Sequence, residues 1–326
     1  MWATPFTAWP IFFHPAMTKT EPFLSDDGIF VVGYPRSGTT LLQSLITALA
    51  TDPVVVSFPE THYFNVIEKS LSPDRDGRVT IDAVRNHLDL IREKTGLDLT
   101  ETELDPLRAA ASEGRVDSRS VFEWIIQSNL RRRNEFASLE RRPFRWLEKT
   151  PYHANFLERI LTLYPRARAV HIVRHPVAAV LSRQRNFPFN QDTPLEELAR
   201  HWDHMLANVE RARARFPEKV ISVQYENLVT RLSQVVTQLQ SFLAIILDIS
   251  RMDRRRKTAA AVRLPGEPWK EKTEKAELFD ANRTYLDHVD AEAVGRIEAF
   301  TAGRMAAWGY SGFEVRNNRK KKDETL

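Results

Sequence analysis

Hydrophobic and polar positions follow two kinds of pattern along the chain from residue 28 onward. The run GIFVVGY, residues 28–34, is short and rich in β-branched side chains, which predicts a strand. LLQSLITALA, residues 41–50, has the apolar spacing of a helix, and the turn PRSGTT lies between the two. This part of the sequence therefore predicts a strand, a loop and a helix.

The same unit recurs later in the chain. Residues 54–58 predict a second strand, and a helix over 151–164 ends at Pro165. RAVHIVR, residues 168–174, is a β-branched strand followed by a His-Pro turn and another helix. After a helix over 195–215, a further strand begins at residue 220. Strands that alternate with helices indicate a parallel sheet, so we expect a three-layer α/β sandwich.

Four segments fall outside this alternation. We expect residues 66–145 to form a long helical insert, acting as a lid or acceptor wall, and the arginine-rich segment 251–272 to be a mobile loop. Residues 1–27, which contain four prolines, are expected to be an N-terminal arm, and residues 316–326 a disordered basic tail. A single domain would then span residues 28–315.

Composition narrows the class of protein. With 42% hydrophobic and 28% charged residues over 326 positions, the chain has the composition of a folded globular protein. Its net charge of +4 is weak evidence for nucleic-acid binding and suits an anionic cofactor equally well. There is no cysteine, which excludes disulfides and thiolate chemistry, and no apolar stretch reaches the roughly 18 residues of a membrane helix. We expect a soluble, cytoplasmic protein; a homodimer is possible.

The loop GYPRSGTT, residues 33–40, places two glycines five positions apart between a strand and a helix. Backbone N–H groups of such a loop and of the helix N-terminus bind phosphate. The loop of ATP-binding proteins ends in Gly-Lys-Ser/Thr, whereas here Thr39 stands at the lysine position and the cation is Arg36. The loop thus predicts an anion site that departs from the nucleoside triphosphate pattern.

YPRSGTT resembles the 5′-phosphosulfate loop of the sulfotransferases that use 3′-phosphoadenosine 5′-phosphosulfate (PAPS). The resemblance implies the sulfotransferase version of the P-loop NTPase-like fold. It also implies that Arg36 contacts the leaving phosphate and the sulfuryl group. The four following residues would bind the 5′-phosphate through amides and hydroxyls; they are Ser37, Gly38, Thr39 and Thr40.

The second signature of this family is a strand ending in arginine, a proline two residues later and a serine eight residues after the arginine. AVHIVRHPVAAVLS matches it with Arg174, Pro176 and Ser182, although His175 replaces the usual aspartate or glycine. The resemblance assigns Arg174 and Ser182 to the 3′-phosphate, for which a guanidinium offers a planar fork of donors.

Two weaker matches follow. VQYENLV is similar to a strand end of the family and would place Tyr225 near the adenine. In GEPWK, Trp269 and Lys270 stand where related enzymes have a loop over the nucleotide, although the usual arginine-lysine-glycine version is absent. A core tyrosine is the alternative for Tyr225.

The remaining candidates concern catalysis. EKTPYHANFL resembles a segment of tyrosylprotein and bacterial sulfotransferases in which the lysine, here Lys149, contacts the bridging region of the donor. FPETHYF resembles their Glu-Thr-Arg segment, which makes Glu60 the general base if burial raises its pKa, with His62 as the competing base. As alternatives, Lys149 is an exposed lysine before a helix and Glu60 a helix-capping carboxylate.

These matches predict sulfuryl transfer from PAPS to a hydroxyl or amine, leaving adenosine 3′,5′-bisphosphate. No metal-ligand spacing is found among the scattered histidines, so we expect catalysis without a metal. A P-loop kinase and a non-catalytic nucleotide-binding protein of the same fold are the alternatives. Small molecules, glycans, lipids and peptides all remain possible acceptors.

Overall fold

A computed structural model describes residues 24–132, 143–275, 278–286 and 289–313. Its centre is a sheet of five strands, β1 (Ile29–Val32), β3 (Val54–Ser57), β6 (Phe144–Glu148), β7 (Arg168–Val173) and β8 (Val220–Gln224). The order across the sheet is β3-β6-β1-β7-β8, and every neighbouring pair is parallel. The carboxyl ends of all five strands therefore lie at one edge of the sheet, where ligands bind in open α/β sheets.

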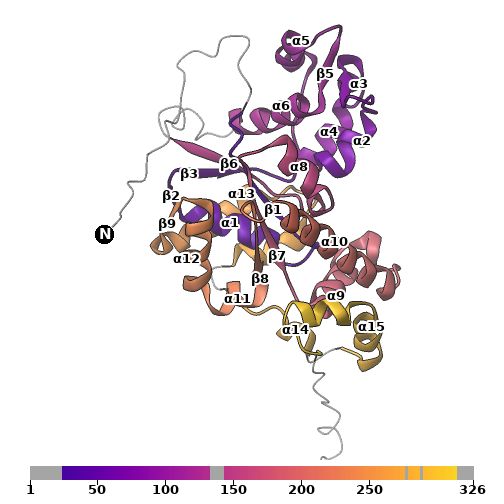
Figure 1. The fold of residues 1–326 in the computed structure, drawn as a ribbon, viewed down its shortest axis with the longest axis vertical. Helices are drawn as coiled ribbons and strands as arrows, with labels where there is room; N and C mark the ends of the chain where they lie inside the picture. The colour runs from indigo at the N-terminus through magenta and orange to yellow at the C-terminus, as the bar shows by residue number, and fades with distance from the viewer. Residues whose placement is uncertain (1–23, 133–142, 276–277, 287–288, 314–326) are drawn as a thin grey trace, which may run out of the picture.

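Alternating side chains of the strands build a core on each face of the sheet. On β1, Ile29 and Val31 belong to one buried cluster, and Phe30 and Val32 to the other. The first cluster is covered by α1 (Thr39–Leu49), α11 (Tyr225–Thr230) and α12 (Leu232–Leu243). The second is covered by α6 (Ser118–Arg131), α8 (Leu157–Leu163), α9 (Pro176–Asn186), α10 (Leu195–Arg215) and α15 (Ala291–Ala307). Figure 1 shows the two helical layers on either side of the sheet, which confirms the three-layer α/β fold expected from the sequence.

The remaining elements surround this sandwich. Two small antiparallel sheets pair β2 (Ala50–Asp52) with β9 (Ile246–Leu247), and β4 (Arg78–Thr80) with β5 (Arg115–Asp117). The other α-helices are α2 (Glu68–Ser70), α3 (Ile81–Asn86), α4 (Leu88–Thr95), α5 (Asp105–Ala110), α13 (Arg255–Ala261) and α14 (Arg283–Leu286). A π-helix, η1 (Tyr63–Ile67), is accompanied by 3₁₀ helices η2 (Glu101–Leu104), η3 (Pro151–Phe156), η4 (Pro188–Asn190), η5 (Ile249–Arg254) and η6 (Pro268–Glu274).

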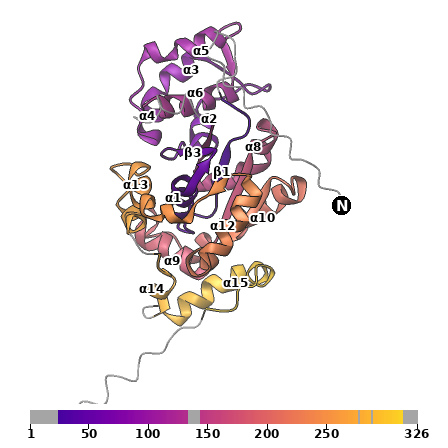
Figure 2. The ribbon, with the colours of Figure 1, turned by 90° about the vertical axis from the view of Figure 1, so that its left-hand side faces the viewer.

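Helices α2 to α6 form a cap at one end of the molecule, and α14 and α15 lie at the opposite end (Figure 2). The segment 66–145 is largely helical, but it is not a purely helical insert, because it contains the antiparallel pair β4–β5 and the start of β6. The prediction missed β6 altogether. Its sequence, FRWLE, places Arg145 and Glu148 among three apolar residues, and both of these charged side chains are buried.

The arginine-rich segment 251–272 was predicted to be a mobile loop, and this is wrong for most of its length. It contains η5, α13 and the first part of η6, and α13 packs against α1. Arg255 is buried and donates to the carbonyl oxygens of Thr273 and Lys275. These arginine contacts hold the segment in place although its apolar residues show no regular spacing.

The basic tail 316–326 and residues 1–23 of the expected arm lie outside the described residues, so the domain limits stay a prediction. Within the described ranges, every helix is too short or too polar to cross a bilayer.

Candidate active site

A cavity of about 730 Å³ opens at the carboxyl edge of the sheet. Four of the five strands are followed by a residue that lines it: Arg36 after β1, Glu60 after β3, Arg174 after β7 and Tyr225 after β8. Lys149, which follows the fifth strand β6, is buried against Glu60. The parallel sheet therefore gathers candidates from positions 36 to 225 in one place.

The glycine-rich loop takes a conformation that requires its glycines. Gly38 has φ +99°, and a Cβ atom there would lie 2.8 Å from the Tyr225 ring. A Cβ on Gly33 would lie 2.4 Å from the Ile172 carbonyl oxygen. Arg36 itself has φ 73°, a left-handed conformation that is unfavourable for a residue with a side chain. The loop stores this strain while it turns the chain into the N-terminus of α1.

The N-terminus of α1 is built to receive an anion. No side chain caps its first turn, and Thr39 and Thr40 line the cavity. The Ser37 hydroxyl is buried and has no hydrogen-bond partner among the described residues. Because a buried hydroxyl without a partner is costly, the group is suited to a ligand that supplies an acceptor. This observation fits a phosphate at the loop.

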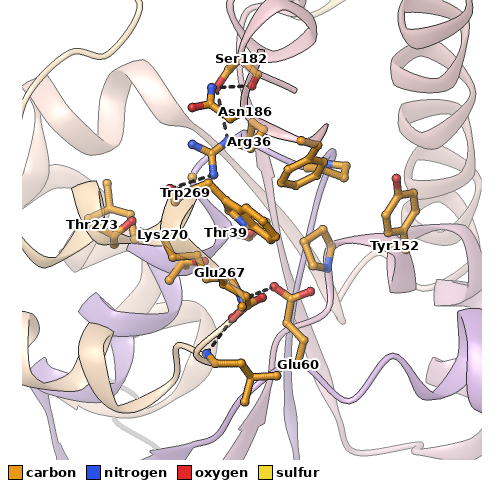
Figure 3. Close-up of a pocket in the computed structure, with 18 of the residues that line it drawn as sticks. Arg36, Thr39, Glu60, Tyr152, Ser182, Asn186, Glu267, Trp269, Lys270 and Thr273 are labelled. Carbon is orange, nitrogen blue, oxygen red and sulfur yellow. Dashed lines mark hydrogen bonds and ion pairs between the residues drawn. The ribbon is translucent and has the colours of Figure 1, made fainter. Parts of the chain in front are cut away.

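Arg36 connects the two predicted anion sites. Its Nε donates to the Ser182 hydroxyl over 3.3 Å, and one of its terminal nitrogens donates to the Trp269 carbonyl over 3.1 Å. In Figure 3, Arg36 lies between Ser182 and Trp269, with Glu60 beyond Trp269. Ser182 and Trp269, which the sequence separates by 87 positions, thus meet on one guanidinium.

Arg174 completes the second anion site. It is buried, donates to the Arg36 carbonyl over 2.9 Å and to Asn282 over 2.7 Å, and stacks above the Tyr225 ring at 4.7 Å from its centre. The Tyr225 hydroxyl donates to the Phe279 carbonyl over 2.9 Å. Asn282 gave no signal in the sequence, because a lone asparagine in an irregular segment matches no motif.

Glu60 lies at the centre of a buried charge cluster. Its Oε1 accepts a hydrogen bond from Lys149 Nζ at 2.5 Å and forms an ion pair with Lys270 Nζ at 2.8 Å, while Oε2 lies 3.3 Å from His62 Nε2. Lys270 also pairs with Glu267. Lys149 is buried, so it is not an exposed lysine before a helix. Lys270, expected at the nucleotide, is brought to Glu60 by η6.

Charge and burial act in opposite directions in this cluster. Burial alone would raise the pKa of Glu60, but Lys149, Lys270 and His62 outweigh it and hold that pKa well below its ordinary value. The expected rise in the pKa of Glu60 is therefore not found, because these charges lower it. Burial lowers the pKa of Lys149 to about 8, partly offset by Glu60, and burial also lowers the pKa of His62.

Beneath this cluster lies a carboxylate that the sequence analysis missed. Glu148 is fully buried and accepts from the hydroxyls of Thr61 at 2.9 Å and Thr150 at 2.6 Å, and from His153 Nδ1 at 2.9 Å. The amides of Thr61 and Thr150 also donate to it. His153 Nε2 in turn accepts from the Phe64 amide, which fixes its tautomer. Glu148 thus ties the Glu60 turn to the Lys149 segment.

A signal for this network existed. Glu148, Thr150 and His153 all lie in EKTPYH, the run from which only Lys149 was selected. A glutamate inside a strand that is otherwise apolar requires buried partners, and this could have directed attention to it.

No group of three or more potential metal-ligating side chains occurs within the described ranges, and the expectation of catalysis without a metal stays a prediction.

Fold and site together define an α/β protein with a phosphate-binding type of loop and a cation-rich cavity at the sheet edge. Residues 28–248 match the model of the sulfotransferase family. This chain belongs to that family, and the family assignment made from the sequence is confirmed.

The relatives found by sequence comparison are distant. The chain is 23% identical over 286 residues to an uncharacterized protein of Aquifex aeolicus, covering 83% of this chain and 33% of that protein. It is 25% identical over 181 residues to the omega-hydroxy-beta-dihydromenaquinone-9 sulfotransferase of Mycobacterium bovis, covering 48% of this chain and 44% of the relative. The chain thus spans less than half the length of either relative.

Among solved structures, the sulfotransferase domain from the curacin biosynthetic pathway is similar, with a TM-score of 0.56 and 18% identity. The match covers 88% of this chain and 99% of that domain. At this identity the likeness establishes the fold.

Proposed function

We propose that the chain transfers a sulfuryl group from PAPS to an acceptor hydroxyl or amine. The observation that carries the proposal is the contact between the two anion sites. Arg36 lies 3.3 Å from the Ser182 hydroxyl, and Arg174 lies 2.9 Å from the Arg36 carbonyl oxygen. A single nucleotide phosphorylated at both ends can therefore reach both sites.

The loop and the first turn of α1, with Ser37, Gly38, Thr39 and Thr40, hold the 5′-phosphate in this proposal. Amide groups at a helix N-terminus favour an anion there. Arg174 and Ser182 hold the 3′-phosphate.

Tyr225, which lies under Arg174, provides an aromatic surface for the adenine. Trp269 and Lys270 close the cavity over the donor. These assignments extend the family's motifs to residues that line or adjoin one cavity.

Lys149 and Lys270 stabilise the charge that develops as the sulfuryl group leaves the phosphate. The acceptor oxygen forms a bond to sulfur, the bond between sulfur and the bridging phosphate oxygen breaks, and the acceptor proton passes to Glu60. The lysines that now hold Glu60 would be attracted to the anionic donor. If a lysine moves from Glu60 to the donor, the pKa of Glu60 rises, because that lysine's charge no longer lowers it. His62, 3.3 Å away, is the competing base.

A hydroxyl is the acceptor group that we favour. The name of the mycobacterial relative specifies a hydroxylated acceptor. The cytoplasmic location and the homodimer stay predictions.

Arg174→Ala tests the proposal. Calorimetry should show binding of adenosine 3′,5′-bisphosphate weakened by about tenfold or more, since a charge-assisted hydrogen bond contributes roughly 1.5–3 kcal/mol. Binding of adenosine 5′-phosphate should change by less than about threefold, because it lacks the contacted group. Arg296→Ala, which removes a surface arginine paired with Glu196, is the control and should change neither. Equal losses for both nucleotides would contradict the assignment.

A transfer assay addresses the reaction itself. PAPS carrying radiolabelled sulfur is incubated with a pooled panel of metabolites and glycans, and labelled products are identified by mass. Labelled product that depends on Glu60 and Lys149 supports the proposal. A protein that binds the bisphosphate but transfers to nothing would favour a non-catalytic member of the family.

A further inference from the structure

Three aromatic side chains form a continuous surface at the cavity, which we call the aromatic wall: Phe187, Phe189 and Trp269. The Phe187 and Phe189 rings stack with centres 5.2 Å apart at 29°. Phe187 meets Trp269 edge to face at 5.0 Å. Because Phe187 directly precedes η4, Phe189 lies within it and Trp269 belongs to η6, the wall joins two segments about 80 positions apart in the sequence.

The side chain of Phe189 is largely exposed, so it contributes little to the packing of the core. With 70% of its surface accessible, it is the most exposed large hydrophobic side chain in the described part of the chain. An exposed aromatic ring beside a cavity marks a surface that an apolar ligand would cover.

The turn that displays Phe189 is held firmly from below. Arg183 is buried and donates from Nε to the Asn190 side chain over 3.0 Å, and the Asn190 amide donates to the Phe187 carbonyl over 2.8 Å. Arg183 also stacks against the rings of Tyr34 and Tyr152. The exposed ring thus stands on a buried support, as expected for a binding surface that is organised in advance.

The wall adjoins the groups that the proposed function assigns to chemistry. The Arg36 guanidinium lies 5.9 Å from the centre of the Phe187 ring and donates to the Trp269 carbonyl. The next residue, Lys270, contacts Glu60. A molecule that lies on the aromatic wall would therefore end beside Glu60 and Arg36. Tyr225, under Arg174, is a separate aromatic surface, so the wall is not needed for the adenine.

We propose that the aromatic wall binds the apolar body of the acceptor, and that the acceptor is an apolar alcohol rather than a glycan or a charged peptide. This inference rests on the proposed function. The hydroxyl of the alcohol loses its proton to Glu60 and its oxygen bonds to sulfur, and adenosine 3′,5′-bisphosphate leaves with the electrons of the broken bond.

A series of primary alcohols tests the class of acceptor. Unbranched alcohols from butanol to decanol are assayed below their solubility limits with radiolabelled PAPS. Burying one methylene is worth about fourfold in binding, so kcat/KM should rise by up to about fourfold per carbon until the wall is covered. Glucose and a tyrosine-containing acidic peptide are the polar comparisons and should be poorer acceptors than decanol.

Phe189→Ser should raise KM for decanol by about tenfold, by removing the exposed ring. Because Phe189 points to solvent, the variant should fold, and its affinity for adenosine 3′,5′-bisphosphate should not change. Phe300→Ser is the matched control, since Phe300 is another exposed phenylalanine, on α15, that does not line the cavity. It should leave KM for decanol unchanged.

The outcomes separate the two proposals. Failure to bind the bisphosphate overturns the proposed function. Normal binding of the bisphosphate with better transfer to glucose or to the peptide overturns the apolar acceptor alone. The apolar-acceptor proposal is also overturned if the rate does not depend on the length of the alcohol. It is likewise overturned if transfer occurs only to an alcohol carried by a partner protein that docks on Phe189.

Discussion

Glu148→Gln probes the network that holds the catalytic candidates in place. The carboxylate of Glu148 has no exposed surface and accepts hydrogen bonds from two backbone amides, two hydroxyls and His153. Hydrogen bonds to a buried charged acceptor contribute roughly 1.5–3 kcal/mol each, about twice as much as neutral ones. Glutamine keeps the shape but removes the charge and turns one oxygen into a donor that faces other donors.

We therefore expect Glu148→Gln to lower the free energy of unfolding by about 3 kcal/mol, measured by urea denaturation. The Glu60 turn and the Lys149 segment lose their common anchor, and a displacement of about 1 Å at the chemistry costs on the order of a hundredfold in kcat. The affinity for adenosine 3′,5′-bisphosphate should change much less, because Arg174 and Ser182 are supported separately.

Glu123→Gln is the control, because Glu123 is a buried carboxylate paired with Arg119 on α6 at 2.6 Å, away from the cavity. It should reduce stability with little effect on kcat. The reasoning is refuted if Glu148→Gln loses stability while kcat stays at the wild-type value, or if both glutamine variants lower kcat alike.

Two further predictions concern the donor site. Burial lowers the pKa of Lys149 to about 8, so this lysine is mostly charged at pH 7 and mostly neutral at pH 9. The affinity for adenosine 3′,5′-bisphosphate, measured by calorimetry, should therefore fall as the pH rises from 7 to 9. Lys149→Arg keeps its charge over this range and should show a flatter pH profile. Gly38→Ala should weaken the same binding by about tenfold or more, because a Cβ atom at φ +99° would meet the Tyr225 ring at 2.8 Å. Gly77→Ala, at φ +74° with open space around it, carries similar backbone strain and should leave binding unchanged.

The sequence predicted the parts of the fold where one physical signal dominated. The strands at 29–32 and 168–173 are short β-branched runs, and the helix Leu195–Arg215 agrees with its predicted bounds. The strand Phe144–Glu148 was missed because two of its five residues are charged. Arg145 is buried in spite of its charge because it donates to the carbonyl oxygens of Asp27 and Leu243, two partners far away in the sequence.

The candidate site was predictable to a similar degree. Arg36, Arg174 and Ser182 were assigned to one nucleotide through the resemblance to the sulfotransferase signatures. Arg36 and Arg174 follow the neighbouring parallel strands β1 and β7, which bring them to one edge of the sheet, and Ser182 follows two turns into α9. The contact of Lys270 with Glu60 was not predictable, since it depends on how η6 folds over the cavity. The pKa of Glu60 was predicted in the wrong direction, because the effect of burial, which raises it, is outweighed by the charges of Lys149 and, next, Lys270.

In the proposed reaction, the position of Glu60 between Lys149 and Lys270 would make it a weak base until the donor binds. A carboxylate bound by two ammonium groups has little affinity for a proton, so it would not compete with solvent before the donor arrives. An anionic donor offers the same ammonium groups a second partner. A lysine that turns from Glu60 toward the donor would stabilise charge at the sulfuryl group. The same movement would raise the pKa of Glu60, because the carboxylate would lose a positive neighbour. If Glu60 is the base, as proposed, its pKa would thus rise in the state in which the acceptor loses its proton.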